Sequence, residues 1–199
     1  RIMELPFSDC TIRGQYFDEL VPLSAGEFFV DVGCFDCGTT VDFIKHCTNY
    51  GRIIAFEPNP ILHKQCVAFI KEQGITKTEI YNMGLWNKKE SLTFSPKGAG
   101  GHISQDGEII VEVNALDELL TDEKVTFIKM DVEGAELKAL QGMRDIIVKN
   151  KPKLAICVYH KPEDIIEIPS YIHGLVSEYK LYMRHYSMSV SETVLYALP

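Results

Sequence analysis

The chain has 199 residues, 46% of them hydrophobic, which is enough for one globular domain with a sizeable core. It carries 28 acidic against 20 basic side chains, and the net charge of −8 repels nucleic acid and anionic membrane surfaces. No basic patch interrupts this balance, so we expect no nucleic-acid partner. The longest apolar runs, such as residues 154–159, are far shorter than the roughly 20 residues that cross a bilayer, so we expect no transmembrane segment.

We expect residues 1–199 to form a single domain, with residues 1–25 as its lead-in. Residues 1–7 lack the charged start and the apolar stretch of a signal peptide. The first residue is Arg1 and not Met, which suggests that sequence upstream is missing.

The cysteines lie scattered through apolar segments, which is typical of buried thiols in a reducing compartment and predicts a cytoplasmic location. The six are Cys10, Cys34, Cys37, Cys47, Cys66 and Cys157. Cys34 and Cys37 have the CxxC spacing of redox and zinc sites. We favour a structural role for this pair, because no second CxxC or paired histidine is near and zinc takes four ligands.

Short apolar, β-rich runs alternate with longer segments of helical period, the pattern of a mainly parallel sheet covered by helices. The expected strands are residues 28–32, 52–56, 79–83, 125–130, 153–159, 180–184 and 193–197. The expected helices are residues 39–47, 60–72, 135–149 and 163–179. The connection between the last two strands is too short for a helical crossover, so these strands should form an antiparallel hairpin.

The sequence therefore predicts an α/β fold with a doubly wound, mostly parallel, seven-stranded sheet of the Rossmann-like kind. The terminal hairpin distinguishes it from a six-stranded dinucleotide fold. Residues 91–114 break the alternation with two short β-like runs around a glycine-rich loop at residues 97–107. We interpret this interval as a β-hairpin inserted before the fourth core strand, and its loop as a flexible turn in preference to a lid.

The first predicted strand runs into a turn typical of nucleotide-binding folds, in the sequence FVDVGCFDCGTT. Gly33 would let a ligand approach the backbone, and Asp31 could accept a hydrogen bond from a cationic ammonium group. Phe35 stands where the dinucleotide fingerprint GxGxxG has its middle glycine, so a pyrophosphate would lack the bare backbone it needs. Thr39 follows with a hydroxyl suited to cap the next helix.

The second predicted strand ends in Glu57 and Pro58, at the spacing from the glycine turn at which an acid binds both ribose hydroxyls. A ribose-binding acid without a diphosphate loop fits S-adenosylmethionine, which we predict as the cofactor. The third strand ends in Met83 and Gly84, where such folds place groups around the adenine, although Met83 also fits a core position. The alternative for the acids is that they only cap neighbouring helices.

The fourth predicted strand ends in the sequence KMDVEGAE, which brings three carboxyl groups to one strand end. Ligands of doubly wound sheets bind at the C-terminal strand ends near the switch point. Asp131 and Glu133 should therefore line the ligand crevice, where Asp131 would also reach the cofactor. For Glu136, in the first turn of the next helix, we favour simple pairing with the helix dipole.

Two histidines, His160 and His185, end the following two strands and could reach the same edge. Methyl transfer to a hydroxyl requires that a proton leave the acceptor, so the candidate catalytic residues are Asp131, Glu133, His160 and His185. The sequence does not decide which of Glu133, His160 and His185 is the base. Converging carboxylates and imidazoles could also hold a divalent metal, but no known ligand spacing is present, so we predict no metal site. No catalytic role is predicted for His46, His63, His102 and His173.

The segments FVDVGCFDCGTT, IIAFEPNP, NMGLW, ALDELL and FIKMDVEGAELKALQGM occur in this order and resemble the FkbM-type methyltransferase family, over roughly residues 16–199. The resemblance implies a class I methyltransferase fold, S-adenosylmethionine as methyl donor, and O-methylation of sugar or natural-product hydroxyls. It implies that Asp31, Gly33 and Glu57 hold the cofactor, while Asp131 and Glu133 line the methyl-transfer site.

The tail of the chain, YHKPEDIIEIPSYIHGLVSEYKLYMRHYS, is similar to the subset of this family found with bacterial surface-polysaccharide enzymes. We therefore expect a glycan or related small-molecule acceptor. Cys37 departs from the family, because similar sequences often carry glycine there, which leaves the geometry of the turn open. Two other functions remain as alternatives: an NAD-dependent oxidoreductase on a similar sheet, and an inactive methyltransferase fold that serves as a binding partner.

Overall fold

The structure is a computed structural model in which residues 14–17 and 19–199 are described. Cys10, predicted to be a buried thiol, lies outside the described residues, as does most of the expected lead-in. The other five cysteines are free and buried, as predicted. Among the helices of the described chain, none combines the length and the apolar character that crossing a membrane requires.

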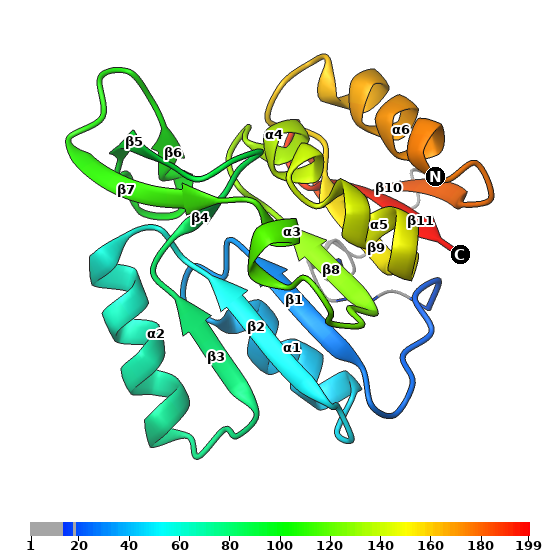
Figure 1. Ribbon diagram of the computed structural model, residues 1–199, viewed down its shortest axis with the longest axis horizontal. Helices are drawn as coiled ribbons and strands as arrows, with labels where there is room; N and C mark the ends of the chain where they lie inside the picture. The colour runs from blue at the N-terminus through cyan, green and yellow to red at the C-terminus, as the bar shows by residue number, and fades with distance from the viewer. Residues whose placement is uncertain (1–13, 18) are drawn as a thin grey trace, which may run out of the picture.

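The centre of the molecule is a seven-stranded sheet (Figure 1). Its strands are β1 (Phe28–Val32), β2 (Arg52–Phe56), β3 (Thr78–Tyr81), β8 (Phe127–Met130), β9 (Lys153–Cys157), β10 (Lys180–His185) and β11 (Thr193–Leu198). They lie in the order β10-β11-β9-β8-β1-β2-β3. Strands β3, β2, β1, β8 and β9 are parallel, while β11 runs antiparallel to both β9 and β10. The predicted doubly wound sheet with a terminal antiparallel hairpin is confirmed.

Helices cover both faces of this sheet and make it the middle of three layers. Helices α1 (Gly38–His46) and α2 (Pro60–Glu72) pack on one face, where Phe43 of α1 stacks on Phe29 with ring centroids 4.3 Å apart. Helices α3 (Leu116–Leu119), α4 (Glu136–Gln141), α5 (Arg144–Asn150) and α6 (Asp164–Leu175) cover the other. β1 is buried along its whole length because both of its faces lie under helices, as continuous apolar runs in parallel sheets require.

The long helix predicted at residues 135–149 is two helices, α4 and α5, which meet at Gly142 and Met143. A Cβ atom at Gly142 would lie 1.8 Å from the carbonyl oxygen of Trp86, so the backbone at Trp86 packs directly on this junction. The helical period continues through the break, which is why the sequence pattern alone predicts one helix. The last helix also ends earlier than predicted, at Leu175.

The predicted inserted hairpin is a separate four-stranded sheet. Its strands are β4 (Gly84–Leu85), β5 (Glu90–Ser95), β6 (His102–Ile103) and β7 (Ile109–Asn114), in the order β4-β7-β5-β6. β5 and β7 pair antiparallel, as expected for the hairpin, while β6 arises inside the glycine-rich loop. Figure 1 shows this small sheet at the end of the molecule toward which the arrowheads of β1, β2 and β3 point. The insertion therefore stands over the C-terminal ends of the parallel strands.

The switch point of the sheet lies between β1 and β8, which leave the sheet in opposite directions. At this point Gly33 follows β1 with a φ of 78°, and a Cβ atom there would lie 2.0 Å from the carbonyl oxygen of Asp131. Glycine is thus required by the close approach of two strand ends, and not only by a ligand. The crevice expected at such a point in α/β sheets opens directly above these two residues.

Candidate active site

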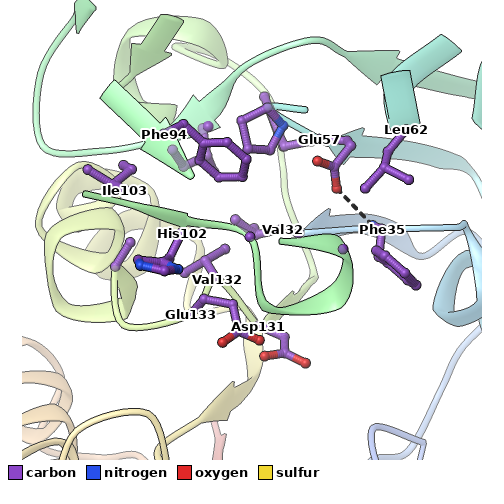
Figure 2. Close-up of a pocket in the computed structure, with 18 residues that line it drawn as sticks. Val32, Phe35, Glu57, Leu62, Phe94, His102, Ile103, Asp131, Val132 and Glu133 are labelled. Atoms are coloured by element: carbon purple, nitrogen blue, oxygen red, sulfur yellow. Dashed lines mark hydrogen bonds between the residues drawn. The ribbon is translucent and has the colours of Figure 1, made fainter. Parts of the chain in front are cut away.

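A pocket opens at the switch point, between the ends of the parallel strands and the small inserted sheet. Its wall on the side of the large sheet, which we call the strand-end wall, is formed by Val32, Gly33, Phe35, Phe56, Glu57, Pro58, Leu62, Asp131, Val132, Glu133 and Ala135. The opposite wall, the insertion wall, is formed by Gly84, Leu85, Phe94, Gly98, Gly101, His102 and Ile103. Figure 2 shows Glu57 on one side of the pocket and the carboxyl groups of Asp131 and Glu133 on the other.

Glu57 holds the turn after β1 in place. The residue is 5% exposed, and its two carboxyl oxygens accept hydrogen bonds from the backbone N–H groups of Phe35 at 3.1 Å and Asn59 at 2.8 Å. Burial raises the pKa of Glu57 to about 7 despite these two bonds. A carboxylate oxygen has room for more than one donor, so Glu57 can still accept bonds from a ligand in the pocket.

Phe35, predicted to bind the cofactor, lines the pocket, and 37% of the residue is exposed. It has a φ of 50°, and Cys37 has a φ of 66°, so the turn makes two left-handed steps at residues other than glycine. Cys37 is the N-cap of α1 and makes no side-chain capping bond. Thr39, predicted to cap the helix and touch the cofactor, is therefore not the cap, and it lies outside the pocket lining.

Asp31 lies beneath the pocket and is fully buried. The parallel register places it beside Lys129, whose ammonium group lies 3.1 Å from the Asp31 carboxylate and donates to the carbonyl of Gly33 at 2.8 Å. Thr40 donates its hydroxyl to the same carboxylate at 2.7 Å. Burial lowers the pKa of Lys129, but the carboxylates of Asp31 and Asp131 outweigh it and hold the pKa above its ordinary value. The cationic partner expected for Asp31 is thus Lys129 within the chain, and direct cofactor contact stays a prediction.

Asp131 lines the pocket and is held from behind by two phenols. Tyr16 donates to its Oδ2 at 3.0 Å, and Tyr159 donates to its Oδ1 at 3.4 Å. Burial is the largest cause that raises the pKa of both tyrosines, and the Asp131 carboxylate adds to it. Both phenols therefore remain donors at neutral pH and keep the carboxylate fixed.

His160 lies among three carboxylates. Its Nε2 atom is 3.4 Å from Asp131 and 3.5 Å from Glu133, while its Nδ1 atom is 2.7 Å from the fully buried Glu136. Burial lowers the pKa of His160, but Glu133 and Glu136 outweigh it and raise the pKa to about 10. The ring is an imidazolium at neutral pH, so it neutralises the carboxylates and is not itself ready to accept a proton.

Glu133 is the pocket carboxylate with most freedom. It has a φ of 54°, and its side chain is 31% exposed. Glu136, expected only to pair with the helix dipole, instead binds His160 and accepts a hydrogen bond from the N–H of Val132 at 3.1 Å. Glu136 thus fixes the loop that carries Glu133.

The remaining predicted residues divide between the pocket and its surroundings. Gly33, Pro58 and Gly84 line the pocket as expected, whereas Met83 packs against the core outside the lining. His185 is exposed at the end of β10, where its Nδ1 atom contacts the hydroxyl of Thr193 at 2.8 Å. β11 separates β10 from β9, so the structure does not bring His185 to the pocket.

Several lining residues were not predicted, and most lie in the insertion. His102 and Ile103 line the pocket from the loop expected to be a simple turn, and Phe94 lines it from β5. Figure 2 shows Phe94 near Ile103, with His102 closer to Val132 and Glu133. The pattern of hydrophobic residues in this loop does not indicate that it lies over the C-terminal ends of the strands of the large sheet. Lys129 could have been predicted from the sequence. A lysine inside an otherwise apolar central strand indicates that a partner of opposite charge is buried beside it.

The charge of the lining distinguishes between cofactors. Glu57, Asp131 and Glu133 are carboxylates, and none of the described lining residues is lysine or arginine. A molecule with ribose hydroxyls and positively charged sulfonium and ammonium groups finds acceptors and opposite charge here. A diphosphate would meet like charges, and the turn at Phe35 offers it no bare backbone. The residues present therefore fit S-adenosylmethionine and do not fit a dinucleotide.

Asp131, Glu133 and His160 could also hold a metal ion, since one ligand atom of each lies within 4.8 Å of the others. Two carboxylates and an imidazole suit several divalent ions. The ion pairs with His160 already neutralise this group, however, so its arrangement has an explanation without an ion.

The strand order, the terminal hairpin and a carboxylate-lined pocket at the switch point define a class I methyltransferase fold. Residues 31–184 match the Methyltransferase FkbM domain family, and the chain belongs to this family. The predicted resemblance is confirmed.

Individual relatives agree with this assignment. Methyltransferase 1 of Beauveria bassiana (strain ARSEF 2860) is 24% identical over 156 residues, which are 64% of this chain and 62% of the relative. The crystal structure of the methyltransferase FkbM from Methylobacillus flagellatus KT superposes with a TM-score of 0.80 at 27% identity, over 92% of this chain and 47% of that one. The chain thus spans less than two thirds of the length of both.

The fold extends to more distant proteins. Fibrillarin of Aeropyrum pernix, solved in complex with natively bound S-adenosyl-L-methionine, matches with a TM-score of 0.52 at 12% identity, over 89% of this chain and 69% of that one. At this identity the likeness concerns the fold alone.

Proposed function

We propose that this protein transfers a methyl group from S-adenosylmethionine to a hydroxyl of a sugar, a glycan or a related small molecule. The observation that carries the proposal is the pocket at the switch point, with three carboxylates and no lysine or arginine among its described lining residues. Membership of the FkbM methyltransferase family supports the same reaction class.

The cofactor would lie along the strand-end wall. Glu57 accepts hydrogen bonds from the ribose hydroxyls, as acids after the second strand do in related nucleotide folds. Pro58 and Leu62, which line the pocket together with Glu57, offer apolar contact for the adenine. The carboxylates of Asp131 and Glu133 attract the positive charge at the other end of the cofactor.

When bound, S-adenosylmethionine supplies a methyl carbon on a positively charged sulfur, which a hydroxyl oxygen can attack. Glu133 accepts the proton that the hydroxyl loses as the oxygen–carbon bond forms and the carbon–sulfur bond breaks. We assign this base to Glu133 because Asp131 already accepts hydrogen bonds from two phenols, while Glu133 lines the pocket and is partly exposed. General bases of this kind contribute about 10²- to 10⁴-fold in rate.

His160 acts as a positioning residue in this proposal. As an imidazolium it holds Asp131 and Glu133 on one side of the pocket and offsets the repulsion between them. His185 has no part in the proposed reaction, since two strands, β11 and β9, lie between β10 and β8.

The acceptor is proposed from the family resemblance and from the chemistry of the pocket edge. The carboxylates of Asp131 and Glu133, together with His102, provide hydrogen-bond partners for several hydroxyl groups at once. The cytoplasmic location predicted from the cysteines stays part of this proposal.

The experiment that tests the proposal is a methyl-transfer screen with isotopically labelled S-adenosylmethionine over nucleotide sugars, free glycans and polyols, read by mass spectrometry. We expect a labelled methyl group on an oxygen of at least one sugar-containing acceptor. Labelling only on nitrogen or carbon acceptors would contradict O-methylation. An absence of labelling by folded protein across the whole panel would contradict the proposed acceptor class.

A further inference from the structure

A second cluster of reactive side chains lies behind the turn that lines the pocket. Cys34 and Cys37 flank Phe35 in this turn, and Cys66 comes from α2. All three thiols are buried, with 2%, 0% and 1% of the residue exposed. Their sulfur atoms lie within 4.8 Å of one another.

The fold creates this cluster from two separate parts of the chain. The left-handed steps at Phe35 and Cys37 bend the turn so that both cysteines of the CxxC sequence point to the same side. α2 begins at Pro60 with Asn59 as its N-cap, and this start brings Cys66 against the turn. Cys66 donates its S–H to the carbonyl oxygen of Phe35 at 3.0 Å.

Three sulfur atoms around one metal ion have a characteristic spacing. A metal–sulfur bond of about 2.3 Å places neighbouring sulfurs roughly 4 Å apart. The three thiols are already within about an ångström of that separation. From the sequence we favoured a structural role for Cys34 and Cys37, because no further metal ligand is near them in the sequence. The fold brings Cys66 beside them as a third ligand.

We propose that Cys34, Cys37 and Cys66 bind one soft, thiophilic metal ion through three thiolates, and that Cu(I) is the ion they fit best. Binding replaces three S–H protons by three metal–sulfur bonds, and the protons leave to solvent. Thiolate ligands select Cu(I) and Zn(II) over harder ions.

The number of ligands separates these two ions. Structural zinc takes four protein ligands, and no fourth ligand atom among the described residues joins the cluster within the same distance. His63 lies one turn before Cys66 on α2, but its Nε2 atom is engaged by the carbonyl oxygen of Ile80 at 3.1 Å. A three-sulfur set without a fourth ligand matches the low coordination number of Cu(I).

The site has a short route to solvent. Phe35 and Asp36 are exposed, so only the turn separates the three sulfurs from the surface. The proposal does not depend on the methyl-transfer reaction, because none of the three cysteines is among the pocket-lining residues.

The test is a Cu(I) titration of the fully reduced chain without oxygen, against a chromogenic Cu(I) chelator, followed by X-ray absorption of the loaded protein. We expect one tightly held Cu(I) per chain, with three sulfur neighbours at a distance near 2.2–2.3 Å, as metal–thiolate bonds have. Cys34→Ser, Cys37→Ser and Cys66→Ser should each weaken binding by about tenfold or more.

Cys47→Ser is the matched control, because Cys47 is also a buried thiol but donates to the carbonyl of Ser24, away from the cluster. It should retain the tight ion. Two results on the unsubstituted protein alone would overturn the proposal. One is that the chain does not hold one Cu(I), and the other is that the bound ion has fewer than three sulfur neighbours. Tight binding that survives Cys66→Ser in a folded protein would overturn it as well.

Discussion

The two walls of the pocket come from different parts of the fold. The strand-end wall carries Glu57, Asp131 and Glu133 at the C-terminal ends of β2 and β8. The insertion wall carries Phe94, His102 and Ile103 from a small sheet between β3 and β8. The first wall follows from the topology common to doubly wound sheets, whereas the second belongs to this insertion.

Because the two walls differ in origin, we expect them to bind different molecules. Elements that every member of a fold class shares suit a shared cofactor, and inserted loops suit a variable acceptor. We therefore assign the cofactor and the proton transfer to the strand-end wall, and acceptor selection to the insertion wall. Changes in the two walls should affect different measured quantities.

The largest effect is expected for Glu133→Gln in the strand-end wall. Gln keeps the shape of the side chain but cannot take the proton, so the rate of methyl transfer should fall by about 10²- to 10⁴-fold. The affinity for S-adenosylmethionine should change by only a few-fold, as measured by calorimetry. Glu72→Gln, at the exposed end of α2, is the control and should keep full activity. Near-normal turnover by the Glu133 variant would remove this residue from the base role.

Glu57→Gln should reduce the affinity for S-adenosylmethionine by about 10- to 100-fold, because it removes a charged hydrogen-bond acceptor. The pKa of Glu57 is about 7, and the ionised carboxylate is the better acceptor for ribose hydroxyls. The affinity of the unsubstituted protein should therefore rise between about pH 6 and pH 8, and the variant should lose this rise.

Circular dichroism separates the effect of Glu57→Gln on binding from an effect on folding. This check is necessary because Glu57 also accepts hydrogen bonds from the N–H groups of Phe35 and Asn59. A folded variant with unchanged affinity would place the ribose elsewhere.

A smaller effect is expected for His102→Ala in the insertion wall. Loss of one hydrogen-bonding group should raise the KM for the acceptor by about three- to tenfold, while the affinity for S-adenosylmethionine stays within about twofold. His173→Ala, on the exposed side of α6, is the matched control. If the His102 variant instead loses cofactor affinity and keeps its KM, the division between the two walls is wrong.

The smallest effect concerns stability and pH. The folded-state pKa of His160 is about 10, above its usual 6.5, so the stability that His160 contributes is complete below about pH 6.5. It is lost as the pH rises toward 10, because the imidazolium then releases its proton. In urea unfolding between pH 6 and pH 10, His160→Gln should show a shallower loss of stability than the unsubstituted protein. An identical slope in both proteins would contradict the ion pairs with Glu133 and Glu136.

Much of the fold could be predicted because hydrophobic period and strand order depend on local sequence. All seven strands of the large sheet were placed within a few residues, and the hairpin of β10 and β11 followed from its short connection. The break between α4 and α5 could not be predicted, because it depends on the distant Trp86 carbonyl packing on Gly142. Period alone does not reveal such a contact.

The site was predictable in part for the same reason. Glu57, Asp131 and Glu133 follow strands directly, and parallel strands end at one edge. The phenol of Tyr16 on Asp131 and the thiol of Cys66 beside the CxxC pair depend on contacts between distant segments. The prediction for His185 was wrong, because a residue at the correct edge of the sheet can still be separated from the site at β8 by two strands, here β11 and β9.

The central claim is that the strand-end wall binds S-adenosylmethionine in preference to a dinucleotide. Calorimetric titrations of the same folded protein with S-adenosylmethionine and with NAD test it most directly. We predict saturable binding of S-adenosylmethionine with one molecule per chain, and no competition from an excess of NAD. Binding of NAD in place of S-adenosylmethionine, or no binding of either, would contradict the assignment of Glu57, Asp131 and Glu133.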